Sequence, residues 1–373
     1  MILAFITFLG FLLLFAVFAI YAERKISAYI QDRMGPMETG PYGLLQTLAD
    51  LLKLLQKEDI IPKAADKLLF IVAPAIIFTA MFSGYAVVPF TPDLLGSNSA
   101  MGIFFLMAIV SLDVLGILMA GWGSNNKFGL YGSLRSVAQI VSYEIPMTLS
   151  ALCVIITCQT FSLQDMCFQQ GTLISFTGET SIEAIENSKN YLFGLKASGI
   201  DLTDIGGFLT WNILRSPILI IAFIVFFISS LAEANRAPFD LPEAESELIG
   251  GYHTEYSGFR FAMFMLAEYG TMLLLSFLAT ILFLGGWNTP LPNIGAAQLA
   301  EWTSGLPSTF AGNAWGAFWM LTKVFGLIFL QMWARWTYPR LRVDQLMSLC
   351  WKYLIPLSLI LVLISSIWKV FMI

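Results

Sequence analysis

The chain has 373 residues, of which 57% are hydrophobic and only 12% are charged, and its formal net charge is -5. This balance lies outside the range of soluble globular proteins and is expected where lipid surrounds the chain. The four cysteines form no C-x-x-C pair and His253 is the single histidine, so the sequence has no metal-ligand spacing. We therefore expect no metal, iron-sulfur cluster or bis-histidine haem on this chain.

Apolar stretches recur along the whole chain, and each is long enough to cross about 30 Å of hydrocarbon. The first stretch has no basic segment before it and no small-residue cleavage site after it, which indicates a span rather than a signal peptide. The sequence predicts an all-α integral membrane protein of about eight transmembrane helices in a single membrane domain, residues 1–373. The predicted spans cover residues 2–21, 68–88, 101–122, 137–158, 213–231, 261–284, 314–333 and 353–371.

The segment between the first two predicted spans carries one apolar stripe. Leucines at positions 44, 45, 48, 51, 52 and 55 recur with helical spacing, and Pro62 ends the pattern. This predicts an amphipathic helix over residues 43–58 that lies in the membrane interface on the cytoplasmic side. Two roles fit the pattern equally: a helix that covers a loop, and a helix that shapes a ligand entrance.

The lysines and arginines predict the orientation of the spans. Fifteen of the 20 lie in loops on one side of the membrane, at 22–67, 123–136, 232–260 and 334–352. The positive-inside rule makes this side cytoplasmic and places both termini on the non-cytoplasmic side. The long connection 159–212 then lies outside the cytoplasm, and its mixed polar composition indicates no role.

Four ionisable residues fall inside predicted spans: Asp113, Glu144, Glu268 and Lys323. A lone ion in hydrocarbon costs about 3 kcal/mol or more, so such residues face a cavity or a partner and are candidates for a functional site. In the alternative interpretation, Lys323 forms a salt bridge with one of the acids and only fixes helix packing. Four such residues in one chain favour an ion path.

The cytoplasmic loop 232–260 is rich in acids, and Pro238 and Pro242 prevent a continuous helix through it. Crowding and burial both raise the pKa of a carboxyl group, which suits proton exchange near neutral pH. A solvated acidic loop is the alternative, but interleaved apolar residues argue against full exposure. The acids of this loop are Glu233, Asp240, Glu243, Glu245, Glu247 and Glu255.

Long motifs occur on the predicted cytoplasmic side. They are A-E-R-K at 22–25 followed by G-P-Y-G-L-L-Q at 40–46, E-A-N-R-A-P-F-D-L-P-E-A-E-S-E-L at 233–248, and P-R-L-R-V-D-Q-L-M at 339–347. Shorter motifs are G-W-G-S-N-N-K at 121–127, S-Y-E at 142–144 and A-E-Y at 267–269. With these motifs in order over nearly its whole length, the chain resembles the H subunit (mitochondrial subunit 1) of respiratory complex I, the proton-pumping NADH:quinone oxidoreductase.

The resemblance implies a subunit that anchors the membrane arm to the peripheral arm and forms the quinone chamber with the adjoining quinone-reducing subunits. The amphipathic helix and the first span would frame the entrance for ubiquinone or menaquinone from the bilayer. NADH would be used by another subunit, no FMN or iron-sulfur cluster is expected on this chain, and the isolated chain should catalyse nothing. The expected partners are the other complex I subunits and membrane lipid, without nucleic acid, in a bacterial inner membrane.

The resemblance also assigns individual residues. Those expected at the quinone chamber are Glu23, Arg24, Arg33, Arg236, Phe239 and Asp240. Those expected along the proton path are Glu144, Glu233, Glu243, Glu245, Glu247, Glu255, Glu268 and Lys323. Asp113 falls where the family is expected to have an uncharged residue, so the resemblance gives it no clear place in the path. Met37 and Glu38 also depart from the R-x-G-P-N pattern of the family close to the proposed entrance.

Two other functions compete with this interpretation. The related membrane subunit of a membrane-bound hydrogenase shares some of the motifs, but the complete quinone-side set favours complex I. A stand-alone proton or cation transporter would use Asp113, Glu144, Glu268 and Lys323, but the sequence shows no repeated pattern of spans of the kind that many transporters have.

Overall fold

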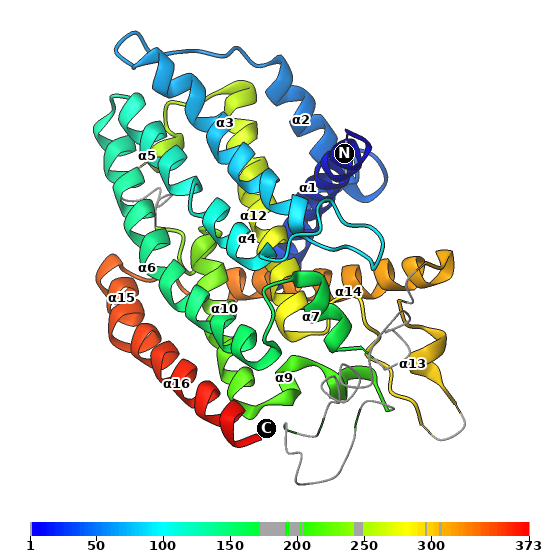
Figure 1. Cartoon of the computed structure of the whole chain (residues 1–373). Coiled ribbons are helices and arrows are strands. Elements are labelled where there is room, and N and C mark those ends of the chain that lie inside the picture. Colours follow the sequence, from blue (N-terminus) through cyan, green and yellow to red (C-terminus); the bar gives the residue numbers. More distant parts are fainter. Residues whose placement is uncertain are drawn as a thin grey trace.

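The computed structural model describes residues 2–171, 191, 193, 202, 205–241, 249–294, 297–305 and 308–372. These residues form a bundle of long helices, and the described part of the chain contains one isolated β-bridge but no strand (Figure 1). The predicted all-α membrane fold is therefore confirmed. The α-helices are α1 (Ile2–Ile30), α2 (Gln46–Gln56), α3 (Lys67–Gly84), α4 (Gly102–Val110), α5 (Asp113–Gly123), α6 (Lys127–Cys158), α7 (Leu163–Gln169), α9 (Asn212–Arg215), α10 (Pro217–Glu233), α12 (Gly258–Phe283), α13 (Leu299–Trp302), α14 (Phe310–Thr337), α15 (Val343–Ser348) and α16 (Ile355–Met372).

Short helical turns connect these elements. The 3₁₀ turns are η1 (Pro41–Gly43), η2 (Tyr85–Val87), η6 (Gly207–Thr210) and η7 (Gly251–His253), and η8 (Leu349–Leu354) is a π-helical segment between α15 and α16. Seven helical segments among the described residues are long and apolar enough to cross a membrane. The predicted span 213–231 corresponds to α10, which is apolar but has 17 residues. At 1.5 Å per residue this helix rises about 26 Å, slightly less than the hydrocarbon thickness.

Several helix boundaries differ from the predicted ones. Helix α1 continues to Ile30, beyond the predicted end of the first span at residue 21, because the charge of Glu23 is paired inside the protein. Helix α6 begins at Lys127, ten residues before the predicted span, where the Asn126 side chain accepts a hydrogen bond from the Phe128 backbone N–H. The predicted span 101–122 corresponds to one helical segment, Gly102–Gly123, in which a tight turn at Ser111 and Leu112 separates α4 from α5.

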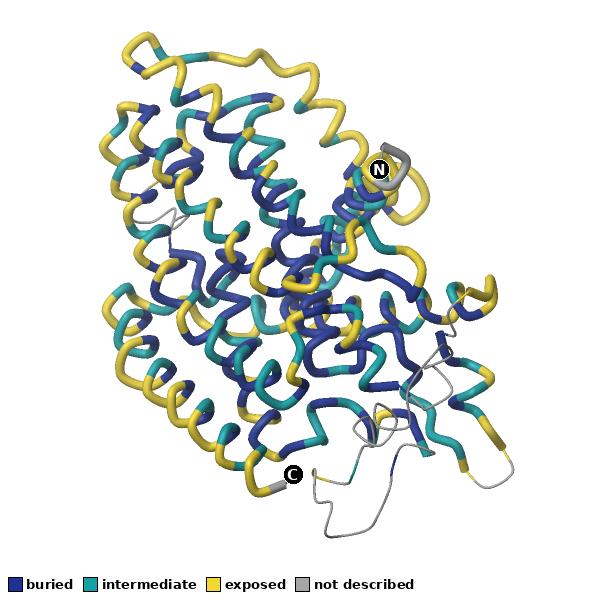
Figure 2. Tube along the Cα trace, viewed as in Figure 1, coloured by how far each residue is buried: buried dark blue, intermediate teal, exposed yellow. Residues whose placement is uncertain are grey.

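Helix α12 forms the centre of the bundle. In its most apolar 18-residue window 89% of the residues are buried, against 22% for the segment that contains α16. It packs against α1, α3, α10 and α14. Figure 2 shows the same contrast, with buried residues in the middle of the bundle and exposed ones along α16 and the loop before α3. A central helix of this kind can carry polar groups that are shielded from lipid on all sides.

Helix α2 lies at the edge of the bundle and contacts α1 and α12 (Figure 1). Its polar face, with Thr47 and Asp50, is turned toward the protein, while its leucines at 48, 51, 52 and 55 are exposed. This agrees with the predicted amphipathic helix, although the α-helix is shorter, Gln46–Gln56. The free leucine stripe suits a helix that rests in the membrane interface.

Candidate functional site

A buried group of charged and aromatic side chains joins α1, α12, α14 and the loop after α10. We call it the Glu23 cluster, and its members are Glu23, Arg236, Tyr269 and Arg335. The Oε2 atom of Glu23 accepts hydrogen bonds from the Tyr269 hydroxyl at 2.5 Å and from Nη1 of Arg236 at 3.4 Å, and its Oε1 accepts one from Nη1 of Arg335. Glu23 and Arg236 are each 6% exposed, so both ions lie inside the protein.

The turn after α10 brings Arg236 into this cluster. Asn235 adopts a left-handed conformation with φ of 49°, which asparagine tolerates better than most residues. The backbone N–H of Arg236 then bonds to the carbonyl of Leu231 at 3.1 Å, which closes the end of the helix. As a result the chain reverses at the helix end, and consecutive side chains at 235 and 236 enter the interior.

The guanidinium of Arg236 has N–H groups that make no hydrogen bond to a described residue. Its centre lies 4.1 Å from the middle of the Tyr269 ring, and Nε and Nη2 are buried without a hydrogen-bond partner among the described residues. Burial alone would lower the pKa of Arg236, but the carboxylate of Glu23 outweighs burial and raises that pKa above its ordinary value. Arg236 therefore stays cationic, and its two donor nitrogens Nε and Nη2 can serve a ligand or water.

The other residues predicted at the quinone chamber have different partners. Arg24, in the C-terminal part of α1, pairs with Asp50 of α2 at 2.7 Å, which ties the amphipathic helix to the first span. Arg33 bonds to the side chains of Gln31 and Ser27. Asp240 pairs with Arg340 at 3.1 Å, and the Phe239 ring packs against Tyr143 with 5.3 Å between ring centres. Thus Glu23 and Arg236 meet, and the other four contact neighbours of their own.

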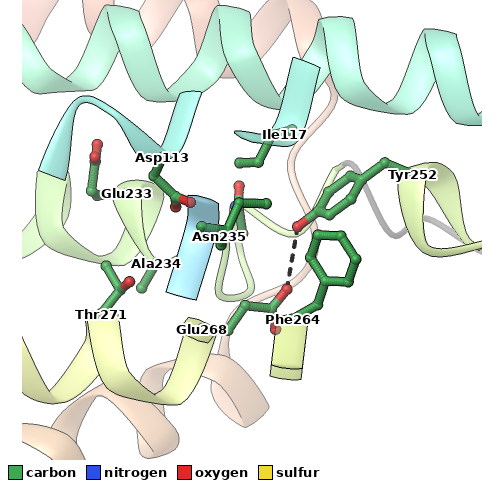
Figure 3. Close-up of a pocket in the computed structure, with 10 residues that line it drawn as sticks. Asp113, Ile117, Glu233, Ala234, Asn235, Tyr252, Phe264, Glu268 and Thr271 are labelled. Carbon is green, nitrogen blue, oxygen red and sulfur yellow. Dashed lines mark hydrogen bonds between the residues drawn. The ribbon is translucent and has the colours of Figure 1, made fainter. Parts of the chain in front are cut away.

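A cavity of about 10 Å³ lies beside the Glu23 cluster, large enough for about one water molecule (Figure 3). We call it the acid cavity because three carboxyl groups from three helices reach it: Asp113 of α5, Glu233 of α10 and Glu268 of α12. Its remaining lining residues are Ile77, Ile117, Ala234, Asn235, Tyr252, Phe264 and Thr271.

The acids that line the cavity differ in their hydrogen-bond partners. Glu268 accepts a bond from the Tyr252 hydroxyl at 3.4 Å and lies 3.2 Å from Nε2 of His253. Glu233 is 3% exposed, and its Oε2 atom is buried without a hydrogen-bond partner in the described part of the chain. A buried carboxylate without partners is costly, which favours a protonated group or a bound water at this position.

The Glu23 cluster and the acid cavity are adjacent. Asn235 lines the cavity and Arg236 belongs to the cluster; in the same way, Glu268 lines the cavity and Tyr269 belongs to the cluster. Arg236 is also close enough to Glu268 for their charges to interact. A change of charge in the cluster therefore acts on the cavity acids over a short distance in a medium of low dielectric constant.

Five further acids are predicted along the proton path, and two of them have described positions. Glu144 of α6 is close enough to Glu233 for their charges to interact. Glu255 accepts a hydrogen bond of 2.7 Å from Nδ2 of Asn126, just before α6. The other three, Glu243, Glu245 and Glu247, lie outside the described residues.

Lys323 of α14 lies apart from the acid cavity. Its ammonium donates to the backbone carbonyls of Leu284, Gly286 and Asn288 at 2.7, 2.9 and 2.6 Å, and it lies 4.2 Å from the Trp211 ring centre. These bonds use all three of its N–H donors. Lys323 thus closes the C-terminal end of α12, and this geometry favours a structural role over a place in the proton path.

Sequence reasoning missed Tyr269 and Arg335 as members of the Glu23 cluster, and His253 as a neighbour of Glu268. Arg335 and Glu23 are 312 positions apart, so no local pattern connects them. His253 has no metal-ligand spacing, but its position in an acid-rich loop was a usable signal. Asp113, to which the resemblance gave no clear place, is part of the cavity lining.

Comparison with known proteins gives consistent matches along the chain. The family described as NADH dehydrogenase matches residues 2–366. A protein of Cytophaga hutchinsonii, named as the second H subunit of an NADH-quinone oxidoreductase, is 58% identical over 98% of this chain and 98% of its own length. Proteins named as the H subunit of NADH-quinone oxidoreductase from Chlorobaculum parvum and Geobacillus thermodenitrificans are 51% and 40% identical, over 97% and 95% of this chain and 90% of each relative.

Proposed function

Because the chain belongs to the NADH dehydrogenase family, we propose that it forms the quinone chamber of a bacterial NADH-quinone oxidoreductase and couples quinone reduction to proton transfer. Its relatives are subunits of an enzyme complex, and it acts as one membrane subunit of such a complex. In this proposal electrons reach the quinone from partner subunits. The chain supplies the binding groups and the proton path, and both of its termini lie on the non-cytoplasmic side.

The observation that carries the proposal is the adjacency of the Glu23 cluster and the acid cavity. Reduction of a quinone places negative charge on its two oxygens until protons arrive. The free N–H donors of Arg236 suit these oxygens, and a fixed cation at that position stabilises the developing charge. Because Glu268 lies next to the cluster, the same charge raises the affinity of the cavity acids for protons.

The proposed proton path runs from the Glu23 cluster through Glu268 and the acid cavity to Glu233 and then toward Glu144. Glu243, Glu245, Glu247 and Glu255 of the acidic loop supply protons from the cytoplasmic side in this proposal. Lys323 is left out because three carbonyl groups hold its ammonium. Arg24, which ties α2 to α1, and the free leucine stripe of α2 support a quinone entrance at the membrane interface.

The first test is purification of the native complex in mild detergent, followed by identification of its partners and an assay of NADH-driven quinone reduction. Copurification with hydrogen-producing partners would contradict the proposal, and so would transport by the purified single chain in liposomes.

The second test is Glu233→Gln, which keeps the size of the side chain and removes its titrating oxygen. We expect a decrease of about tenfold or more in quinone reduction and proton pumping per assembled complex. Glu301→Gln on α13 is the matched control, since Glu301 lines no part of the acid cavity. Equal activity of the two variants would refute the path through Glu233.

A further inference from the structure

The third membrane-spanning segment, Gly102–Gly123, tightens locally where it passes the acid cavity. Helix α4 ends at Val110 and α5 begins at Asp113, with tight bonds in between from Leu112 N–H to Ile109 O at 3.0 Å and from Leu115 N–H to Leu112 O at 3.1 Å. Neither glycine nor proline occupies this turn, so local residue preference does not require the tightening. Ser111 and Leu112 keep right-handed helical backbone angles, so the segment stays helical and tightens locally to i→i−3 hydrogen bonds. Tightened turns of this kind inside a helix often mark functional positions.

Asp113 directly follows this tightened turn and lines the cavity. Figure 3 shows its carboxyl group in the lining together with Glu233 and Glu268. Its Oδ1 atom is buried, and among the described residues it has neither a hydrogen-bond partner nor a cation paired with it. The charges of Asp113 and Glu268 interact, as do those of Asp113 and Glu233. Helix capping and ion pairing, the ordinary roles of a buried aspartate, are therefore not observed here.

The nearly enclosed Glu233 is a second, independent sign of an occupant in this cavity. Its Oε2 atom also lacks a partner among the described residues, although only 3% of the residue is exposed. One water fits a cavity of about 10 Å³, and the site offers it carboxyl oxygens and the hydroxyl of Tyr252 as partners. Such a water would connect the carboxyl groups that line the cavity.

We propose that Asp113 is an additional proton-carrying carboxyl group, which connects Glu268 with Glu233 through a water in the acid cavity. The inference rests on the proposed function, because it adds a member to the same proton path. In each step a proton leaves the O–H of one carboxylic acid, the water accepts it and releases another proton, and a carboxylate oxygen receives it. No electron moves and no other bond changes, so the step needs no co-reactant.

The test is Asp113→Asn in the intact complex, studied in native membranes. We expect the proton pumping rate and the rate of quinone reduction to fall at least about threefold per assembled complex, because Asn keeps the shape but carries no exchangeable carboxyl proton. Asp165→Asn is the matched control: Asp165 also lies in the first turn of a helix, α7, but not in the cavity lining. The control should keep the wild-type rates.

A second pair of variants separates a proton-carrying role from a structural one. Asp113→Glu and Asp113→Gln have the same length and differ in the carboxyl group, so Glu should retain more activity than Gln even if both reduce assembly. Infrared difference spectra between oxidised and reduced complex should show a carboxylic-acid signal that is missing in Asp113→Asn.

The outcomes distinguish this inference from the proposed function. Wild-type rates in Asp113→Asn, or equal impairment of the Glu and Gln variants, would overturn the role of Asp113. Loss of activity in Glu233→Gln alongside an unaffected Asp113→Asn would leave the path intact without Asp113. Full activity in both variants would reject the path itself.

Discussion

The substitution Glu23→Gln tests the Glu23 cluster directly. It keeps the size of the side chain, and the Gln carbonyl can still accept the bond from Tyr269, but Arg236 and Arg335 lose their negative partner. Because Arg236 is 6% exposed, its charge stays buried and unpaired, and removal of one member of a buried ion pair costs about 3–5 kcal/mol. The side chain of Arg335 is 25% exposed, so its share is about 1 kcal/mol or less.

We expect this loss of stability to lower the thermal unfolding temperature of the solubilised complex. The KM for quinone should also rise several-fold, because Arg236 is then free to reorient. The matched control is Asp50→Asn, which breaks the Arg24–Asp50 pair on the same side of the bundle. In that pair the side chains are 44% and 26% exposed, so its loss costs about 0–1 kcal/mol. Equal changes in unfolding temperature for the two variants, or an unchanged KM in Glu23→Gln, would refute the reasoning.

Three further substitutions test the packing around the two sites. Gly132→Ala places a methyl group 2.7 Å from the backbone of η7, so it should cost about 1–3 kcal/mol of stability. It should also slow quinone reduction, because it shifts the loop that contacts Glu268. The control is Gly326→Ala, whose added methyl group meets open space and should leave the wild-type rate unchanged. Lys323→Met should lower the unfolding temperature of the complex, whereas unchanged stability with lost proton pumping would instead support a place in the path. Arg340→Ala removes the half-exposed partner of the buried Asp240, so it should cost about 1–3 kcal/mol within the chain. If this charge docks the peripheral arm, the variant complex should dissociate at lower salt in sucrose-gradient sedimentation, and unchanged dissociation would exclude that role.

Composition and hydropathy were sufficient to predict the fold class, because lipid requires long apolar helices. They did not predict the tightened turn after Val110 or the extension of α1 to Ile30, where charges suggested a loop. Both features depend on tertiary contacts: a cavity beside the first, and arginines from the end of α10 and from α14 beside the second.

Part of the candidate site could also be predicted from the sequence, because lipid disfavours charge. Intramembrane charge singled out Asp113 and Glu268 before any contact was known, since an isolated ion in hydrocarbon is costly. The resemblance supplied Glu23 and Arg236, but not that they bond to each other. Tyr269 carried no signal of its own, because an aromatic residue in an apolar helix is ordinary.

Helix α12 connects the two sites as a rigid body. Glu268 and Tyr269 are neighbours on this helix, separated by a rise of about 1.5 Å and a turn of about 100°, so one points into the acid cavity and the other into the Glu23 cluster. Any rotation of α12 about its axis would therefore change the surroundings of both side chains simultaneously. The bonds of Lys323 to the backbone at the far end of the helix resist such a rotation, so the two sites are coupled mechanically as well as electrostatically.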